Sequence, residues 1–264
     1  MSCPDCRKGV VLEGEPTGHI DPNTGAYVAS GPEGNTSRAI LLLTDVFGLG
    51  LKNPEILADN LSKRLSCDVY APDIFAGKPP VTPEVMKLPA RAGEKVSMLK
   101  VIWSSLPYLP SLLIRNRPSV VDSRVKQFIE KLQSEKKYEK LGAVGYCFGG
   151  AMCIRFGNSG LLKTIIICHP GSFSQKDLEA ISIPCSWVCA EDDFVFGPAA
   201  RAKAEKSFES RKGKDNFVEY EFKDYKGTTH GFASRPNMEY PEVKEGFEQA
   251  FEQTVNWFNK TIPA

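Results

Sequence analysis

The sequence of 264 residues contains no apolar run that could cross a membrane, because no stretch reaches the roughly 18 consecutive apolar residues that a spanning helix needs. It also lacks an excess of charge of one sign: the formal net charge is +1, and neither basic nor acidic residues gather in blocks. These absences argue against a membrane partner and against a nucleic-acid partner. The polar N-terminus has no apolar signal core, so we expect a cytoplasmic protein.

Internal repeats and low-complexity linkers are absent as well. Hydrophobic residues make up 42% of the chain, close to the average for globular proteins, so a chain of this length can bury a core without disulfide bonds. We therefore predict a single domain over residues 1–264. Glycine, proline, asparagine and threonine are frequent in residues 1–36, which indicates an N-terminal extension of turns and short strands.

The eight cysteines show no convincing metal-binding pattern. Most lie in apolar runs, where a thiol behaves as a small hydrophobic side chain, and in a reducing compartment we expect free thiols. Cys3 and Cys6 form one CxxC pair, but no second pair follows at a spacing typical of zinc sites. A packed or irregular N-terminal segment is the favoured interpretation and structural zinc the alternative. We predict no metal and no cofactor.

From residue 38 onward, short apolar segments alternate with segments of helical periodicity. Strands are predicted at residues 39–44, 69–71, 141–145, 164–168, 185–190 and 218–222, and helices at residues 54–65, 120–132, 149–156, 199–210 and 242–259. This alternation predicts an α/β fold with a mostly parallel central sheet and helices on both faces. In such sheets, ligands bind beyond the carboxyl ends of the strands.

One segment, residues 88–118, does not follow this alternation. It is rich in apolar residues but is broken by Pro107 and Pro110. We predict a helical insertion near the active site, with a cap that shapes the substrate pocket as the alternative.

The stretch LGAVGYCFGG, residues 141–150, places Cys147 between a predicted strand and a predicted helix. Gly-x-Cys-x-Gly in this context is the nucleophile-elbow pattern with cysteine in the serine position. The flanking glycines would avoid clashes at a sharp turn, and the helix N-terminus would favour negative charge on the nucleophile. The N–H of Phe148 would point at a developing oxyanion. The competing interpretation is a glycine-rich turn that holds a buried cysteine.

A nucleophilic thiol needs a base, and the chain offers His19, His169 and His230. In α/β-hydrolases the chain order is nucleophile, acid, histidine, and only His230, in a loop of small residues before the last helix, fits this order. His169 ends a predicted strand and is interpreted as a hydrogen-bonded structural histidine, with a place in the pocket wall as the alternative.

The acid should follow the strand at residues 185–190. Glu191, Asp192 and Asp193 are adjacent there, so spacing alone leaves the choice among them open.

Taken together, five segments resemble the dienelactone hydrolases (carboxymethylenebutenolidases). They are TDVFG at residues 44–48, APDIF at 71–75, GYCFGG at 145–150, AEDDFV at 190–195 and THGF at 229–232. Cysteine in the elbow is the most specific of these features, because most α/β-hydrolases use serine. The N-terminal segment looks more like that of the eukaryotic, fungal-type members. The resemblance implies an α/β-hydrolase fold.

The resemblance also implies roles for individual residues. Cys147 matches the family nucleophile and His230 the base. Asp193 matches the acid, with Asp192 as the alternative.

Four further positions match parts of the family's substrate site. The amides of Val46 and Phe148 correspond to the oxyanion hole. Asp45 matches a carboxylate that contacts the resting thiol and the substrate, although the family's archetype has the longer glutamate there. Arg235 lies one residue away from an arginine that holds the substrate carboxylate.

The function that follows is cysteine-dependent hydrolysis of a small carboxylic ester or lactone, by a monomer or homodimer. One alternative is a non-catalytic α/β-hydrolase relative that binds a small molecule or a partner. Another is a thiol redox protein, which would need a resolving cysteine near Cys147. We expect the nearest cysteine in sequence, Cys153, to be buried in the helix.

Overall fold

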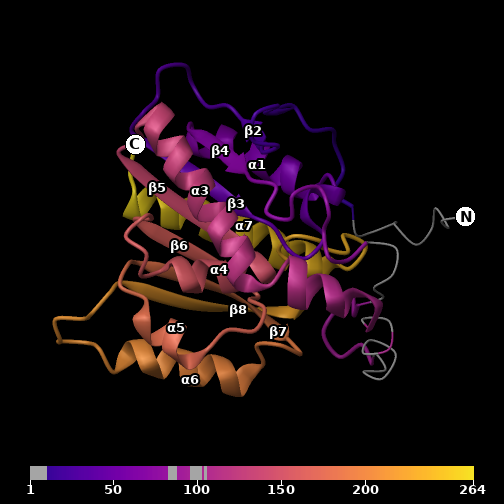
Figure 1. The fold of residues 1–264 in the computed structure, drawn as a ribbon. Helices are drawn as coiled ribbons and strands as arrows, with labels where there is room; N and C mark the ends of the chain where they lie inside the picture. Colours follow the sequence, from indigo (N-terminus) through magenta and orange to yellow (C-terminus); the bar gives the residue numbers. More distant parts are fainter. Residues whose placement is uncertain (1–10, 83–87, 96–102, 104–105) are drawn as a thin grey trace, which may run out of the picture.

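The computed structural model describes residues 11–82, 88–95, 103 and 106–264. Within them, eight strands form one sheet in the order β1-β2-β4-β3-β5-β6-β7-β8 (Figure 1). The strands are β1 (His19–Ile20), β2 (Tyr27–Ala29), β3 (Arg38–Leu43), β4 (Asp68–Ala71), β5 (Lys140–Tyr146), β6 (Thr164–Cys168), β7 (Cys185–Asp192) and β8 (Tyr220–Thr229). Strands β3 to β8 pair in parallel, whereas β1 and β2 add an antiparallel edge.

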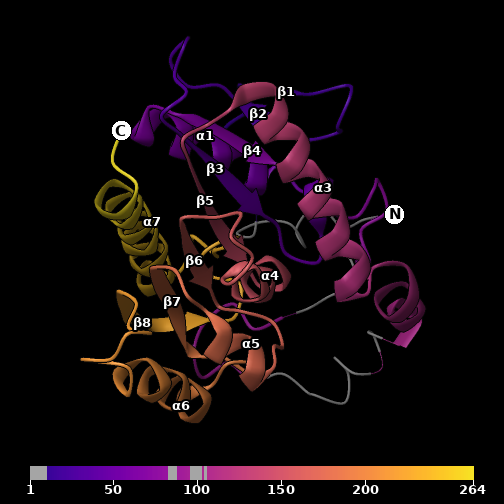
Figure 2. The ribbon, with the colours of Figure 1, turned by 60° about the vertical axis from the view of Figure 1, so that its left-hand side comes forward.

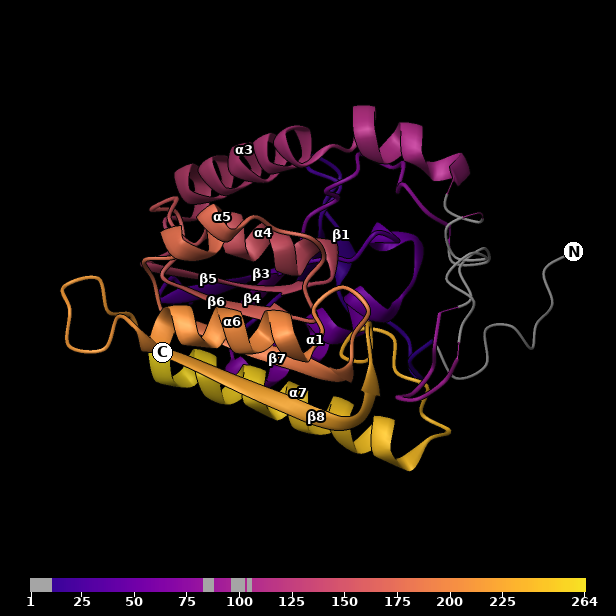
Figure 3. The same cartoon turned by 90° about the horizontal axis from the view of Figure 1, so that it is seen from below.

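Helices cover both faces of this sheet, as predicted (Figures 2 and 3). The helices are α1 (Asn53–Leu65), α3 (Pro118–Lys136), α4 (Phe148–Phe156), α5 (Gln175–Ala180), α6 (Pro198–Glu209) and α7 (Pro241–Thr261). Helices α1 and α7 pack on one face, and α3, α4, α5 and α6 on the other, so the sheet separates two hydrophobic cores.

Strand β3 shows why the central strands are apolar without alternation. Leu41 and Leu43 lie in the core under α3 and α4, whereas Ile40 and Leu42 lie in the core under α1 and α7. A parallel strand covered on both faces must be apolar at every position, because successive side chains point to opposite faces.

The structure differs from the sequence prediction at three places. Strand β8 continues to Thr229 rather than ending near residue 222; His230 is the first residue of the loop between β8 and α7, where it was predicted to lie. Helix α5 was not predicted. Residues 11–36 supply β1 and β2 to the sheet itself rather than only leading into it. Cys3 and Cys6, the candidate zinc pair, lie outside the described residues.

The described parts of the predicted insertion are short and irregular. They contain a 3-10 turn (Leu106–Tyr108) and a π-helical turn (Ser111–Arg115) before α3 begins; the rest of the predicted helices lies outside the described residues. Residues 88–95 are tied to the carboxyl ends of β7 and β8, because Ala92 N–H donates to the Gly227 carbonyl at 3.0 Å and Gly93 N–H to Asp192 Oδ2 at 3.0 Å. This part of the insertion therefore lies at the edge where a ligand is expected.

None of the helices within the described ranges combines the length and apolarity needed to cross a bilayer.

The core under α6 can be tested at Trp187, which is fully buried and stacks on Phe222 at 4.8 Å and on Phe196 at 5.5 Å between ring centroids. Trp187→Ala should lower the free energy of unfolding by about 3–5 kcal/mol, because it leaves a large cavity. Urea denaturation measures the loss. Trp103 is 70% exposed and provides a control of the same residue type, so Trp103→Ala should change stability little. Equal losses in the two variants would contradict this account of the core.

Candidate active site

The turn between β5 and α4 consists of one residue, Cys147, whose backbone has φ 52° and ψ −107°. Its two glycine neighbours are required by close backbone packing. A Cβ at Gly145 would overlap the carbonyl of Gly149, and a Cβ at Gly149 would overlap the carbonyl of Leu43 in β3. The Gly-x-Cys-x-Gly pattern is thus explained by the close approach of strand, helix and neighbouring strand, which only residues without a side chain permit.

Cys147 also differs from the other cysteines in exposure. Of the six cysteines in the described residues, Cys147 is partly exposed and the other five are buried, and all are free thiols. Burial raises the pKa of Cys153, as expected for an inert thiol packed in a helix. A redox partner for Cys147 would need an accessible second thiol, and none exists within the described residues.

Two backbone amides lie at the same sheet edge as this sulfur. Phe148 begins α4, and Val46 lies in the turn after β3. The Gly149 amide donates to the Thr44 carbonyl at 3.0 Å, which ties the elbow to that turn. Neither the Val46 amide nor the Phe148 amide donates a hydrogen bond to another described residue. Both remain available to a ligand oxygen.

His230 and Asp193 form a buried pair beside Cys147. His230 Nδ1 lies 2.9 Å from Asp193 Oδ2 and 3.0 Å from Oδ1. A carboxylate can only accept, so Nδ1 donates and Nε2 is left for the thiol. The amides of Val195 and Phe196 donate to Asp193 Oδ1 at 2.8 and 2.9 Å and hold the carboxylate in place.

The charges of this pair stabilise each other despite burial. Burial disfavours the charged form of His230. The charge of Cys147 and the hydrogen bond and charge of Asp193 outweigh this effect and raise the pKa of the imidazole above its ordinary value. Burial likewise opposes ionisation of Asp193, but the bond and charge of His230 and two amide bonds lower the pKa of the carboxyl. The bond to Asp193 and the nearby charge of Cys147 thus act on the imidazole in the same direction.

The three adjacent acids have different partners. Glu191 Oε2 accepts from the Gly227 amide at 2.7 Å, and Asp192 Oδ2 accepts from the Gly93 amide; both side chains are exposed. Only Asp193 of the three points inward, to His230. The structure therefore places Asp193, rather than Asp192, next to the histidine.

Asp45 and Arg235, which the resemblance implies as substrate-binding residues, are paired with each other. Arg235 Nε donates to Asp45 Oδ2 at 2.7 Å, and the two side chains are 10% and 5% exposed. The guanidinium lies over the ring of Phe47 at 4.6 Å, and the Phe47 amide donates to Asp45 Oδ1 at 3.0 Å. None of the hydrogen bonds of Asp45 within the described residues goes to Cys147. The thiol contact implied by the resemblance is absent, because Arg235, Ser234 and Phe47 engage the short carboxylate.

Two rings beside His230 complete the site. Phe194 is 45% exposed, and its ring centroid lies 5.0 Å from that of His230. Sequence reasoning missed Phe194, although its position next to Asp193 was a usable signal. His169, the second ring, is fully buried, and within the described residues neither of its ring nitrogens has a hydrogen-bond partner. The prediction of a hydrogen-bonded structural histidine is therefore wrong for this ring.

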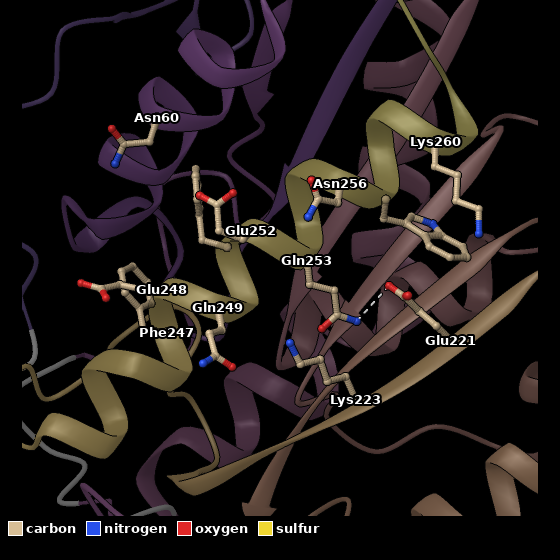
Figure 4. A pocket seen from close by; sticks show the side chains of 12 residues that line it. Asn60, Glu221, Lys223, Phe247, Glu248, Gln249, Glu252, Gln253, Asn256 and Lys260 are labelled. Atoms are coloured by element: carbon tan, nitrogen blue, oxygen red, sulfur yellow. Dashed lines mark hydrogen bonds between the residues drawn. The ribbon is translucent and has the colours of Figure 1, made fainter.

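A separate groove of about 730 Å³ lies along α7, β8 and α1 (Figure 4). Gln253 donates to Glu221 across it at 3.1 Å. The groove contains none of the predicted site residues, and its paired polar side chains form no nucleophile and base. Nor do the described residues anywhere gather three or more His, Cys, Asp or Glu side chains suited to a metal ion.

The strand order and the positions of the elbow and histidine turn define an α/β-hydrolase fold, which solved structures share. A putative dienelactone hydrolase from Klebsiella pneumoniae superposes with a TM-score of 0.66 at 13% identity, over 89% of this chain and 92% of the other. An α/β serine hydrolase from Xanthomonas campestris gives a TM-score of 0.56 at 11% identity, over 96% and 98% of the two chains. At these identities the likeness establishes the fold.

The family follows from sequence. The model of the "Dienelactone hydrolase family" matches residues 25–262, and the chain belongs to this family; it is an enzyme, a carboxylic ester hydrolase. Hydrolase tropI of Talaromyces stipitatus is 29% identical, over 98% of this chain and 96% of the relative. A carboxymethylenebutenolidase homolog of Mus musculus is 27% identical, over 90% and 87% of the two chains.

The partnership of Asp193 and His230 gives a direct test. Asp193→Asn keeps the side-chain shape but removes the charge, so the pKa of His230 should fall. NMR titration of the ring signals measures this shift, and with three histidines in the chain the assignment is simple. Asp192→Asn is the matched control and should leave the pKa of His230 unchanged, because Asp192 bonds the Gly93 amide. Equal shifts in the two variants would refute the pairing.

Proposed function

We propose that this enzyme hydrolyses small carboxylic esters and lactones with Cys147 as nucleophile, His230 as base and Asp193 as the residue that orients the base. The observation that supports this most strongly is a partly exposed sulfur at a strained elbow, whose charge acts on a histidine that is held at Nδ1 by a buried carboxylate. The membership in the dienelactone hydrolase family supports an ester bond as the target.

The first step forms an acyl-enzyme. His230 takes the thiol proton, and the sulfur of Cys147 attacks the carbonyl carbon. As the carbon–sulfur bond forms, the carbonyl electrons move to the oxygen, where the amides of Val46 and Phe148 donate hydrogen bonds. Loss of one such donor typically raises the barrier by about 3 kcal/mol.

The second half of the reaction cycle releases both products, the alcohol and the acid. The tetrahedral intermediate collapses, the bond to the leaving oxygen breaks, and that oxygen takes the proton from His230. Water then attacks the thioester with His230 as base, and the acid leaves while the thiol regains a proton. Esters suit this chemistry better than amides, because a thiolate is expelled from the intermediate more readily than an amine.

Asp45 and Arg235 are included in this proposal as a coupled pair. Asp45 holds the turn that carries the Val46 amide through its bond to Phe47. Asp45 also accepts a hydrogen bond from Nε of Arg235. The terminal N–H groups of the guanidinium are then left as donors for a substrate carboxylate. The free thiols of the six described cysteines are in keeping with a cytoplasmic location.

The nucleophile is tested with small activated esters. Cys147→Ala and His230→Ala should each lower kcat/KM by about 10³-fold or more, as expected when a triad member is removed. Iodoacetamide should inactivate the parent enzyme at Cys147, the partly exposed thiol. His19→Ala, at an exposed strand far along the sheet, is the histidine control and should retain full activity. If hydrolysis of every ester survives Cys147→Ala, the nucleophile is wrongly assigned.

A further inference from the structure

Two other rings pack against the imidazole of His230. The His169 ring contacts it edge-on, with 5.1 Å between centroids and an interplanar angle of 63°. The Phe194 ring lies 5.0 Å away at 50°. Asp193 fixes the direction of Nδ1, but a bond at one atom does not by itself fix the plane of the ring. Packing against neighbouring rings is a second kind of constraint, and it acts on the plane of a ring.

His169 is an unfavourable residue for a core position. It is fully buried, and among the described residues its two ring nitrogens have no partner. Its backbone has φ 33°, a conformation that side-chain-bearing residues rarely adopt. Buried polar atoms without partners and positive φ values both lower stability, and such features gather at functional sites.

The backbone around His169 is bonded to the elbow and to β7. The Cys147 amide donates to the Cys168 carbonyl at 3.1 Å, and the Gly171 amide donates to the Cys147 carbonyl at 2.8 Å. The His169 amide donates to the Val188 carbonyl at 2.8 Å. The segment at residues 168–171, which includes the His169 ring, is therefore hydrogen-bonded directly to the backbone of Cys147.

The remaining sides of the His169 ring are packed. Tyr146 lies 6.1 Å away and Phe232 5.8 Å away, between ring centroids. Burial and the nearby charge of His230 lower the pKa of His169, so this ring stays neutral. A neutral ring can contact an imidazolium without the repulsion that a second positive charge would bring.

We propose that His169 is a positioning residue whose buried ring holds the His230 imidazole in the plane that directs it to Cys147. This inference rests on the proposed function, since it assigns His169 a part in activating the same thiol. His169 has no exposed surface and does not touch the substrate; it acts through His230.

The test compares His169→Leu, which removes the ring at similar volume, with His169→Phe, which keeps a ring but removes the nitrogens. In His169→Leu, kcat on an activated ester should fall by about 10- to 100-fold with KM nearly unchanged, the loss typical of a misplaced catalytic group. His169→Phe should retain more of kcat than His169→Leu. Melting temperatures of the leucine variant should equal or exceed that of the parent, because two unpartnered polar atoms are removed.

A second readout does not depend on ester turnover. The rate of Cys147 alkylation by iodoacetamide at neutral pH should fall in His169→Leu together with kcat, because a displaced His230 no longer takes the thiol proton. His19→Leu is the matched control and should change neither rate.

These measurements separate the two proposals. Full kcat and full alkylation rate in His169→Leu would overturn the role of His169, as would equal losses in folded leucine and phenylalanine variants. If His169→Phe does not fold, the leucine variant decides alone: slower alkylation supports the role, and parent-like alkylation overturns it. If the parent enzyme hydrolyses no ester through Cys147, the proposed function fails. The alkylation rates still test whether His169 positions His230.

Discussion

The site depends on the close approach of three backbone segments at the elbow. Strand β5, helix α4 and strand β3 come so near each other that positions 145 and 149 accept no side chain, and Cys147 is forced into a conformation with positive φ. This packing presents the sulfur at the sheet edge and at a helix N-terminus. The other site residues then follow from topology, because parallel strands bring their carboxyl ends to one edge.

Much of this arrangement could be predicted because it follows from local rules. The elbow pattern requires glycines for a steric reason that is visible in the sequence, and the chain order singled out His230 among three histidines. The central strands were recognisable because burial on both faces makes them apolar throughout. Family resemblance added the particular acid, Asp193, which spacing alone did not distinguish.

What escaped prediction depends on the direction of side chains and on weaker local signals. The three adjacent acids lie at the end of β7, where the register shifts between Ala190 and Asp192, and no periodicity shows which of them faces inward. The second half of β8 is an edge strand with polar and charged residues, so it lacked an apolar pattern. Helix α5 could have been found, since Ser174 and Asp177 form a capping box at its start.

The elbow restricts the main chain and the two glycine positions. It depends very little on whether the side chain between the glycines ends in sulfur or in oxygen. A side chain with oxygen in place of sulfur at this position would lie at the same turn, near the same amides and the same imidazole. A chain with a thiol at this position accordingly shares its fold with a serine hydrolase that is 11% identical. The backbone at this turn is therefore compatible with cysteine and with serine, and the rest of the scaffold need not change between them.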